Sequence, residues 1–129
     1  MKVKRVLKFY FCADRLEVRL NNLILKRALS SKNSYNAEAC ADDLIKLIEA
    51  KRELSNLYAF LNGVLKNFSC EEVKVLKFYA AMRKGLSTVS EPVKRQIRRV
   101  TVKFTRKCNS VELRFSTALK LVGEYYCLT

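Results

Sequence analysis

Apolar residues recur along this chain at helical spacing, three and four positions apart. Near its start, Leu16, Leu20 and Leu23 lie on one such face, and basic side chains flank that face or lie opposite it. An apolar stripe with a charged opposite face is typical of an amphipathic helix, so we predict one over residues 7–29. The polar, turn-rich residues 30–36 that follow predict a loop.

The next segment repeats its apolar residues every seven positions, and we predict a long helix over residues 37–67. The repeat predicts two seams along the helix. The first seam consists of Leu47, Leu54, Leu61 and Phe68. The second seam lies three residues earlier and consists of Leu44, Lys51, Tyr58 and Leu65. Heptads sustained in this way predict either antiparallel packing on the first helix or a coiled-coil homodimer. We favour an intramolecular hairpin, and a homodimer through Leu47, Leu54 and Leu61 is the alternative.

Helix boundaries are clearest just after this hairpin. Ser69 and Glu72 have the spacing of a capping box, in which a hydroxyl and a carboxylate satisfy two free backbone N–H groups. The helix that they begin is expected to end at Gly85. Ser90 and Pro92 then suit the cap and the first turn of another helix.

The segment after Pro92 is predicted to be a basic amphipathic helix. Its apolar stripe is Val93, Ile97, Val100 and Phe104. Residues 100–105 also alternate with a period of two and are rich in β-branched side chains, so a short strand there is the alternative. Asn109 or Ser110 can cap a final helix, which Gly123 is expected to close.

Composition supports a helical fold class. The chain has 129 residues, half of them apolar, with only three Gly and one Pro. Scarce turn residues argue against a sandwich or a barrel, and we predict an all-α fold. In this interpretation residues 1–68 form the hairpin, and residues 69–129 form a bundle of shorter basic helices that continues from it as one domain.

Several function classes are not expected. No apolar run approaches the roughly 18 residues of a membrane span, and the one after Arg5 contains Lys8 and lacks the cleavage site of a signal peptide, so we predict a cytoplasmic protein. The chain has no His, and its five Cys include no Cys-x-x-Cys pair, so we expect neither a metal site nor a cofactor. Without a His base, a nucleophile motif or a Gly-rich phosphate loop, we do not expect an enzyme.

Positive charge is concentrated near the end of the chain. Residues 83–107 hold nine Lys or Arg and a single acid, Glu91, which gives a local net charge of +8 out of +14 for the chain. Protein surfaces usually mix both signs, so this segment needs a polyanion, and nucleic acid is the commonest one. The candidates for phosphate contacts are Arg95, Arg98, Arg99, Lys103, Arg106 and Lys107.

The last third of the chain has the element order of a helix-turn-helix. The basic helix would lie across the sugar-phosphate backbone, and the final helix would enter the major groove of double-stranded DNA. The candidates for base contacts are Asn109, Ser110, Glu112 and Arg114. If roughly six phosphates are neutralised, affinity is expected to fall by about three to five decades between roughly 50 and 200 mM salt.

The pattern of residues also resembles a known family, the short sigma-factor-like proteins and late-transcription activators of Firmicute phages and prophages. The residues that carry the resemblance are Leu7, Tyr10, Asp14 and Leu20, the segments 43–53 and 71–79, and Ser110, Val111, Arg114 and 118–121. The resemblance implies a helix-turn-helix like region four of sigma factors, transcriptional regulation, and contact with RNA polymerase. It departs from the family pattern after Gly85, where additional residues precede the basic helix.

Two other functions fit the same residues. An RNA-binding helical protein would use the same cations, although RNA readers usually stack unpaired bases on exposed aromatic side chains, and here most aromatics lie in apolar stripes. Tyr125 and Tyr126 are the exceptions in the sequence. A protein-interaction module would recruit a partner through the heptad helix and would place its basic face against an acidic protein.

Overall fold

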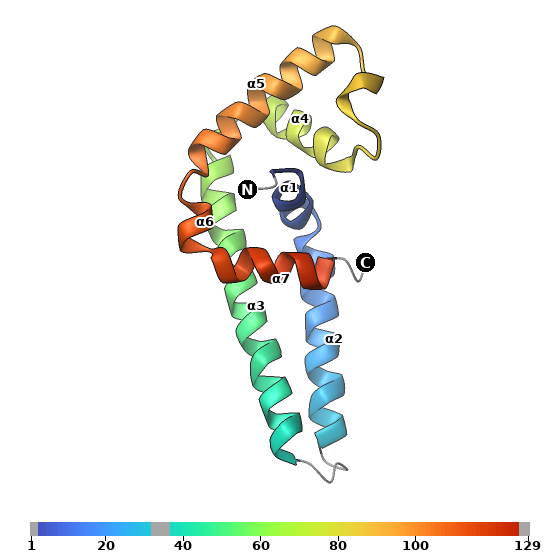
Figure 1. Cartoon of the computed structure of the whole chain (residues 1–129), viewed down its shortest axis with the longest axis vertical. Coiled ribbons are helices and arrows are strands. Elements are labelled where there is room, and N and C mark those ends of the chain that lie inside the picture. The colour runs from blue at the N-terminus through green and yellow to red at the C-terminus, as the bar shows by residue number, and fades with distance from the viewer. Residues whose placement is uncertain (1–2, 32–36, 127–129) are drawn as a thin grey trace.

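The structure, a computed structural model, describes residues 3–31 and 37–126 (Figure 1). Within these ranges every regular element is helical, which confirms the predicted fold class, and residues 100–105 are helix rather than strand. The elements are α1 (Val3–Phe11), α2 (Ala13–Ser31), α3 (Ala37–Leu65), α4 (Cys70–Ala81), the 3-10 turn η1 (Leu86–Thr88), α5 (Glu91–Lys107), α6 (Val111–Arg114) and α7 (Ser116–Tyr126).

Two parts can be distinguished in the molecule (Figure 1). The hairpin consists of α2 and α3, which lie side by side and run in opposite directions. The head consists of α1 and α4 to α7, which gather around the C-terminal half of α3, with α7 crossing α3 and α5 at the far end. The distal half of the hairpin, where α2 ends and α3 begins, projects away from the head.

The first predicted helix is in fact two helices that meet at Cys12. α1 buries Val6, Leu7 and Phe9, and it packs against α4 and α7. α2 instead packs along α3. Because the two helices bury their apolar faces against different partners, one straight helix cannot serve both, and the chain bends between them.

The predicted seams of the long helix are partly correct. In the first seam Leu54, Leu61 and Phe68 are buried, but in the second seam Tyr58 is 37% exposed. A third line, Ala50, Leu57 and Val64, is buried and was missed. The reason is that α3 packs against α2 on one side and against α7 on another, so its buried face is wider than a heptad seam.

A homodimer through Leu47, Leu54 and Leu61 is wrong for this fold. Leu54 and Leu61 are almost completely buried within the chain's own core, and Leu47 is partly buried against it. These side chains are therefore not available to a second copy of the chain.

Three predicted helix ends also differ. α4 begins with the predicted capping box but ends at Ala81, four residues before Gly85, and Met82 beyond it is extended. The final helix is interrupted at Phe115 and continues as α7 through Gly123 to Tyr126. Gly123 therefore lies within α7 rather than at a helix end, and a Cβ there would make only an ordinary van der Waals contact, 3.5 Å from the Arg5 guanidinium.

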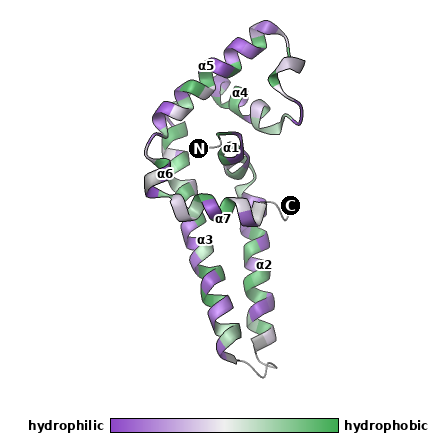
Figure 2. Ribbon diagram, in the orientation of Figure 1, coloured by the Kyte–Doolittle hydropathy of each residue, from purple (hydrophilic) through white to green (hydrophobic). Residues whose placement is uncertain are grey.

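One core joins the hairpin to the head. Its wholly buried side chains include Leu7, Leu61, Leu76, Phe104 and Val122, which come from five different helices. Figure 2 shows how apolar and polar residues alternate along each of these ribbons. Because α5 contributes Phe104 to this core, the basic helix is held in a defined position on the head.

Candidate nucleic-acid interface

α5 presents one long face to solvent at the far end of the head (Figure 1). Its buried side chains are Ile97, Val100 and Phe104, and the helix packs against α4. The opposite face is exposed and carries, at helical spacing, Arg95, Arg98, Arg99, Val102 and Arg106. With 17 residues, α5 offers a cationic face about 25 Å long.

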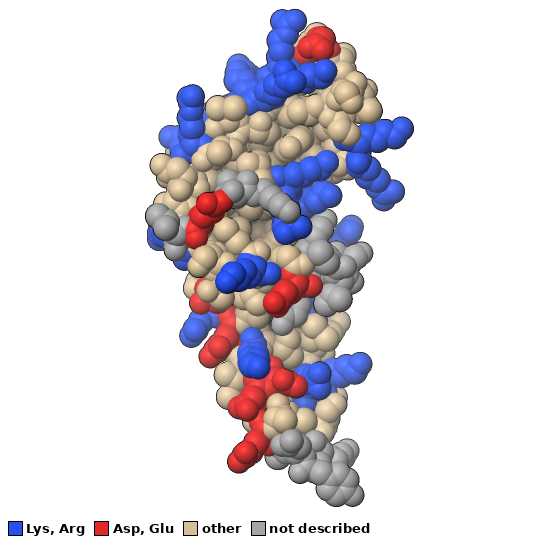
Figure 3. Space-filling view, in the orientation of Figure 1, with Lys and Arg blue, Asp and Glu red and all other residues tan. Residues whose placement is uncertain are grey.

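The side chains on this face line a shallow groove. The residues that line it are Arg98, Arg99, Val102, Lys103, Arg106 and Lys107. In the space-filling view, Lys and Arg gather over the far end of the head, whereas Asp and Glu gather along α3 on the hairpin (Figure 3). The sequence has the same division, because residues 13–65 hold eight Lys or Arg and seven acids, and the rest of the chain holds eighteen and five.

Most cations on α5 have no carboxylate close to them. The helix has seven Lys or Arg, and two of them form ion pairs, Lys94 with Glu91 at 3.1 Å and Lys103 with Glu72 at 2.9 Å. For the other five, no acid lies within 4.0 Å in the described part of the chain; they are Arg95, Arg98, Arg99, Arg106 and Lys107. A row of unpaired cations on a rigid helix attracts an external polyanion.

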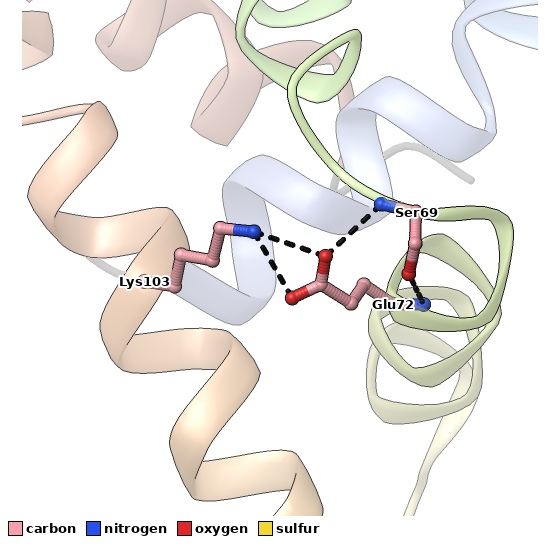
Figure 4. A network of polar contacts seen from close by, with 3 residues as sticks. All are labelled: Ser69, Glu72 and Lys103. Atoms are coloured by element: carbon pink, nitrogen blue, oxygen red, sulfur yellow. Dashed lines mark hydrogen bonds and ion pairs between the residues drawn. The ribbon is translucent and has the colours of Figure 1, made fainter.

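Lys103 joins α5 to α4 rather than facing solvent freely (Figure 4). Its Nζ donates hydrogen bonds to Oε1 and Oε2 of Glu72 at 2.9 and 3.1 Å, and it lies 4.5 Å from the centre of the Phe68 ring. Glu72 Oε1 also accepts from the Ser69 backbone N–H at 3.0 Å, and the Ser69 hydroxyl accepts from Glu72 N–H at 3.1 Å. Lys103 is therefore a weaker candidate for a phosphate contact than the unpaired cations of α5, because its ammonium group already pairs with Glu72.

The same network changes the acidity of Glu72. The Ser69 backbone N–H first, and then the Lys103 ammonium, stabilise the ionised carboxylate and lower the pKa of Glu72 from its ordinary 4.5. A carboxyl whose pKa is lower in the folded state contributes stability that is present above its ordinary pKa and is lost as the pH falls through the lowered pKa.

We therefore expect Glu72→Gln to lower the midpoint of thermal unfolding at pH 7, and to lower it less as the pH falls below 4.5. Circular dichroism melts between about pH 3 and pH 7 measure this difference. Glu71→Gln is the matched control, because Glu71 lies in the same helical turn and is exposed. A deficit in the Glu72 variant that is equally large at low and neutral pH would contradict the role given to the charge.

Three of the four residues predicted to contact bases are exposed, and all four lie in the turn after α5 and in the short α6 rather than along one long helix. Asn109 and Ser110 lie in the turn after α5, and Ser110 is partly buried. Glu112 is exposed in α6, which has only four residues. Arg114 is exposed, and its guanidinium lies 5.3 Å from the Phe60 ring centre and 5.4 Å from that of Phe115.

The predicted recognition helix is divided into two helices, α6 and α7. α6 forms a single turn, and α7 buries Ala118 and Val122 against the core while it packs on α1 and α3. An element that reads the major groove must project from the surface, and among the described helices α5 has the largest excess of cations, with seven Lys or Arg and one acid. The helix-turn-helix arrangement is therefore not confirmed, and α5 is the better candidate for contact with nucleic acid.

Sequence reasoning missed two features of the head. Val102 is 48% exposed in the middle of the cationic face, although a valine in a basic amphipathic helix is expected to face the core. Phe78 is 52% exposed on α4, with Lys74 and Lys77 on the same exposed side. Both residues are three or four positions from a basic residue. This spacing places them on the same helix face as the basic side chain, and it was the signal in the sequence that could have predicted their exposure.

The described cysteines differ in burial. Cys108 is buried between α5 and α6, and burial raises the pKa of its thiol to about 11, so it stays protonated at neutral pH. Cys12, Cys40 and Cys70 are free thiols, and Cys127 lies outside the described residues. Among the described residues, no group of three or more Cys, Asp or Glu is arranged to hold a metal ion.

Comparisons with known proteins do not extend this picture. No family model matches the chain, and neither curated proteins nor solved structures give a match. None of the described helices combines the length and the apolar character that a membrane crossing requires.

Proposed function

We propose that this protein binds double-stranded DNA through the outer face of α5. The observation that carries the proposal is the set of five exposed cations on one helix for which the described residues supply no carboxylate. They lie on a helix whose opposite face is fixed in the core by Phe104, so little ordering is needed on binding.

The dimensions of α5 suit the major groove. The groove is about 12 Å wide, which admits one α-helix, and a helix about 25 Å long can follow it with phosphates on both sides. An apolar side chain suits the thymine methyl group. We assign a base contact of this kind to Val102 at the centre of the face, and the phosphate contacts to the five cations around it.

We extend the proposal to transcriptional regulation, with RNA polymerase as a further partner. The support for this step is the resemblance of the chain to sigma-factor-like phage proteins, which is independent of the geometry of α5. In this proposal α5 takes the place that the resemblance gives to the helix after Asn109.

The first test is the dependence of duplex binding on salt. With five free cations engaged, log K is expected to fall with log[salt] with a slope of about −4.5, so affinity falls roughly 500-fold between about 50 and 200 mM salt. Fluorescence anisotropy on a random-sequence duplex measures this slope. A slope near zero, or no binding at low salt, would reject the proposal.

RNA binding is the second candidate, and Phe78 favours it. An aromatic ring that is half exposed beside Lys74 and Lys77 is suited to stack an unpaired base. Titrating the protein in parallel against duplex DNA, duplex RNA and single-stranded RNA distinguishes RNA binding from duplex DNA binding. If the single strand binds most tightly and Phe78→Ala weakens only that complex, the RNA interpretation replaces the duplex one.

A further inference from the structure

A small cavity opens to solvent where α1, α2 and α3 meet. Its volume is about 100 Å³, and no residue of α5 lines it, so it is separate from the cationic face. Its wall is apolar and rigid, because it is made of core side chains that are each 4% exposed or less. They are Phe9 of α1, Leu16 and Leu20 of α2, and Leu54 of α3.

The local sequence explains why this space is not filled by the chain itself. Ala13, the first residue of α2, lines the cavity with a side chain of a single methyl group. Tyr58 of α3 lies at its edge, and the ring is stacked on that of Tyr10 of α1, with the ring centres 5.0 Å apart. Lys51 stands at a seam position that an apolar residue would otherwise fill. An apolar space of this kind between packed helices is suited to an apolar ligand group of matching size.

Polar side chains of both signs surround the mouth of the cavity. Asp14 and Glu17 are exposed and lie three residues apart on α2, so they share one helix face. Lys51, which is half-buried, and Ser55, which is exposed, come from α3. Within residues 3–31 and 37–126, no ion pair shorter than 4.0 Å includes Asp14, Glu17 or Lys51. The mouth therefore offers two unpaired carboxylates on one helix and an unpaired ammonium group with a hydroxyl on the other.

We propose that this cavity binds a free amino acid with a branched aliphatic side chain, such as leucine. The α-ammonium group of the ligand pairs with Asp14 and Glu17, and its α-carboxylate accepts hydrogen bonds from Lys51 and Ser55. The side chain of the ligand enters the apolar space. An apolar cavity of about 150 Å³ holds benzene, so a cavity of about 100 Å³ suits an aliphatic side chain better than a large aromatic ring. A ligand with one charge only would leave the opposite charge at the mouth unpaired.

The proposed site is independent of the nucleic-acid proposal, so it is tested without nucleic acid. NMR titration of the isotope-labelled full chain with L-leucine is the measurement. The matched ligands are isoamylamine, which lacks the carboxylate, isocaproate, which lacks the ammonium group, and glycine, which lacks the side chain. Leucine is expected to bind about three- to tenfold more tightly than isoamylamine or isocaproate, and at least about tenfold more tightly than glycine.

The amide signals that leucine shifts are expected to belong to residues 13–20 and 51–58, which contain the cavity-lining residues of α2 and α3. If these signals do not move with leucine up to about 50 mM, the proposal is overturned. It is also overturned if leucine binds no more tightly than isoamylamine, since the cation of α3 then has no part in binding.

Lys51→Met tests the contact with the carboxylate, because it keeps most of the aliphatic stem and removes the ammonium group. The variant is expected to bind leucine about three- to tenfold more weakly, with no loss of affinity for isoamylamine. Lys46→Met is the matched control, because Lys46 is exposed on α3 and does not line the cavity. Equal losses in the two variants would show that binding follows net charge, and the proposed site would be wrong.

The Asp14→Asn, Glu17→Gln double variant tests the contact with the ammonium group. It is expected to weaken leucine and isoamylamine, and to leave isocaproate at least as tightly bound as before. The matched control is Glu38→Gln, Asp42→Asn, which changes two exposed acids of α3 that do not line the cavity. If the control weakens leucine as much as the first variant does, the assignment of the ammonium group is wrong. The amide spectrum of each variant verifies that it is folded.

Discussion

Replacing Arg98, Arg99 and Arg106 together by alanine is expected to lower the affinity for duplex DNA by about 100- to 1,000-fold. All three side chains are exposed on α5, and no acid among the described residues lies within 4.0 Å of them. If each contact contributes about 1 to 1.4 kcal/mol, slightly less than the roughly 1.5 to 3 kcal/mol of a hydrogen bond to a charged group, three contacts give this factor. The slope of log K against log[salt] is expected to become shallower by about 2.7.

The matched control removes three cations from the hairpin. Arg15, Lys26 and Lys46 are also exposed, and replacing them by alanine changes the net charge by the same amount. If the cationic face of α5 makes the contacts, this control keeps most of the affinity and nearly all of the salt slope. If both triple variants lose affinity equally, binding follows total charge, and the assignment to α5 is wrong.

A third outcome would point to a protein partner. An acidic protein could bind the same cations, and then neither triple variant would change DNA affinity, because the wild type itself would bind DNA only weakly. The geometry argues against this outcome, because acidic protein surfaces rarely offer a continuous line of charge that matches a helix about 25 Å long.

The charge of this molecule is unevenly distributed along the chain. Residues 13–65 are nearly neutral, with eight cations and seven anions. The rest of the chain carries a net charge of +13, and a surface with such an excess of one sign attracts a polyanion.

The sequence predicted the elements well where local rules decide them. The Ser69–Glu72 capping box and the beginning of the long helix at Ala37 are both correct, because each depends on residues close together in the chain. The break at Cys12 and the buried line through Leu57 were missed. Both follow from which helix packs on which, and periodicity along one segment carries no information about that.

The candidate site was predictable in part for the same reason. Arg98, Arg99 and Arg106 were identified from their spacing alone, and the structure places them on one exposed face. The ion pair between Lys103 and Glu72 joins residues 31 positions apart, so only the fold could show it. The stacking of Arg114 on Phe60 is equally non-local, although Arg114 itself stays exposed.

Phe104→Ala is expected to lower the free energy of unfolding by about 3 to 5 kcal/mol, the usual cost of removing a buried phenylalanine. Phe104 is wholly buried, and its ring lies 6.3 Å from the ring of Phe68, centre to centre. It is the largest side chain with which α5 enters the core, so the variant leaves a cavity beneath the cationic face. Small domains are stable by only about 5 to 15 kcal/mol, so the loss is a large share of the total.

Urea denaturation at neutral pH measures the change, and Phe78→Ala is the matched control. Phe78 is 52% exposed on α4, and its removal is expected to change stability by about 0.5 kcal/mol or less. The cationic face depends on a fixed position of α5. The Phe104→Ala variant is therefore also expected to bind duplex DNA more weakly, although it keeps every arginine of that face. If Phe104→Ala is no more destabilising than Phe78→Ala, α5 is not anchored in the core, and a rigid cationic face cannot be the basis of binding.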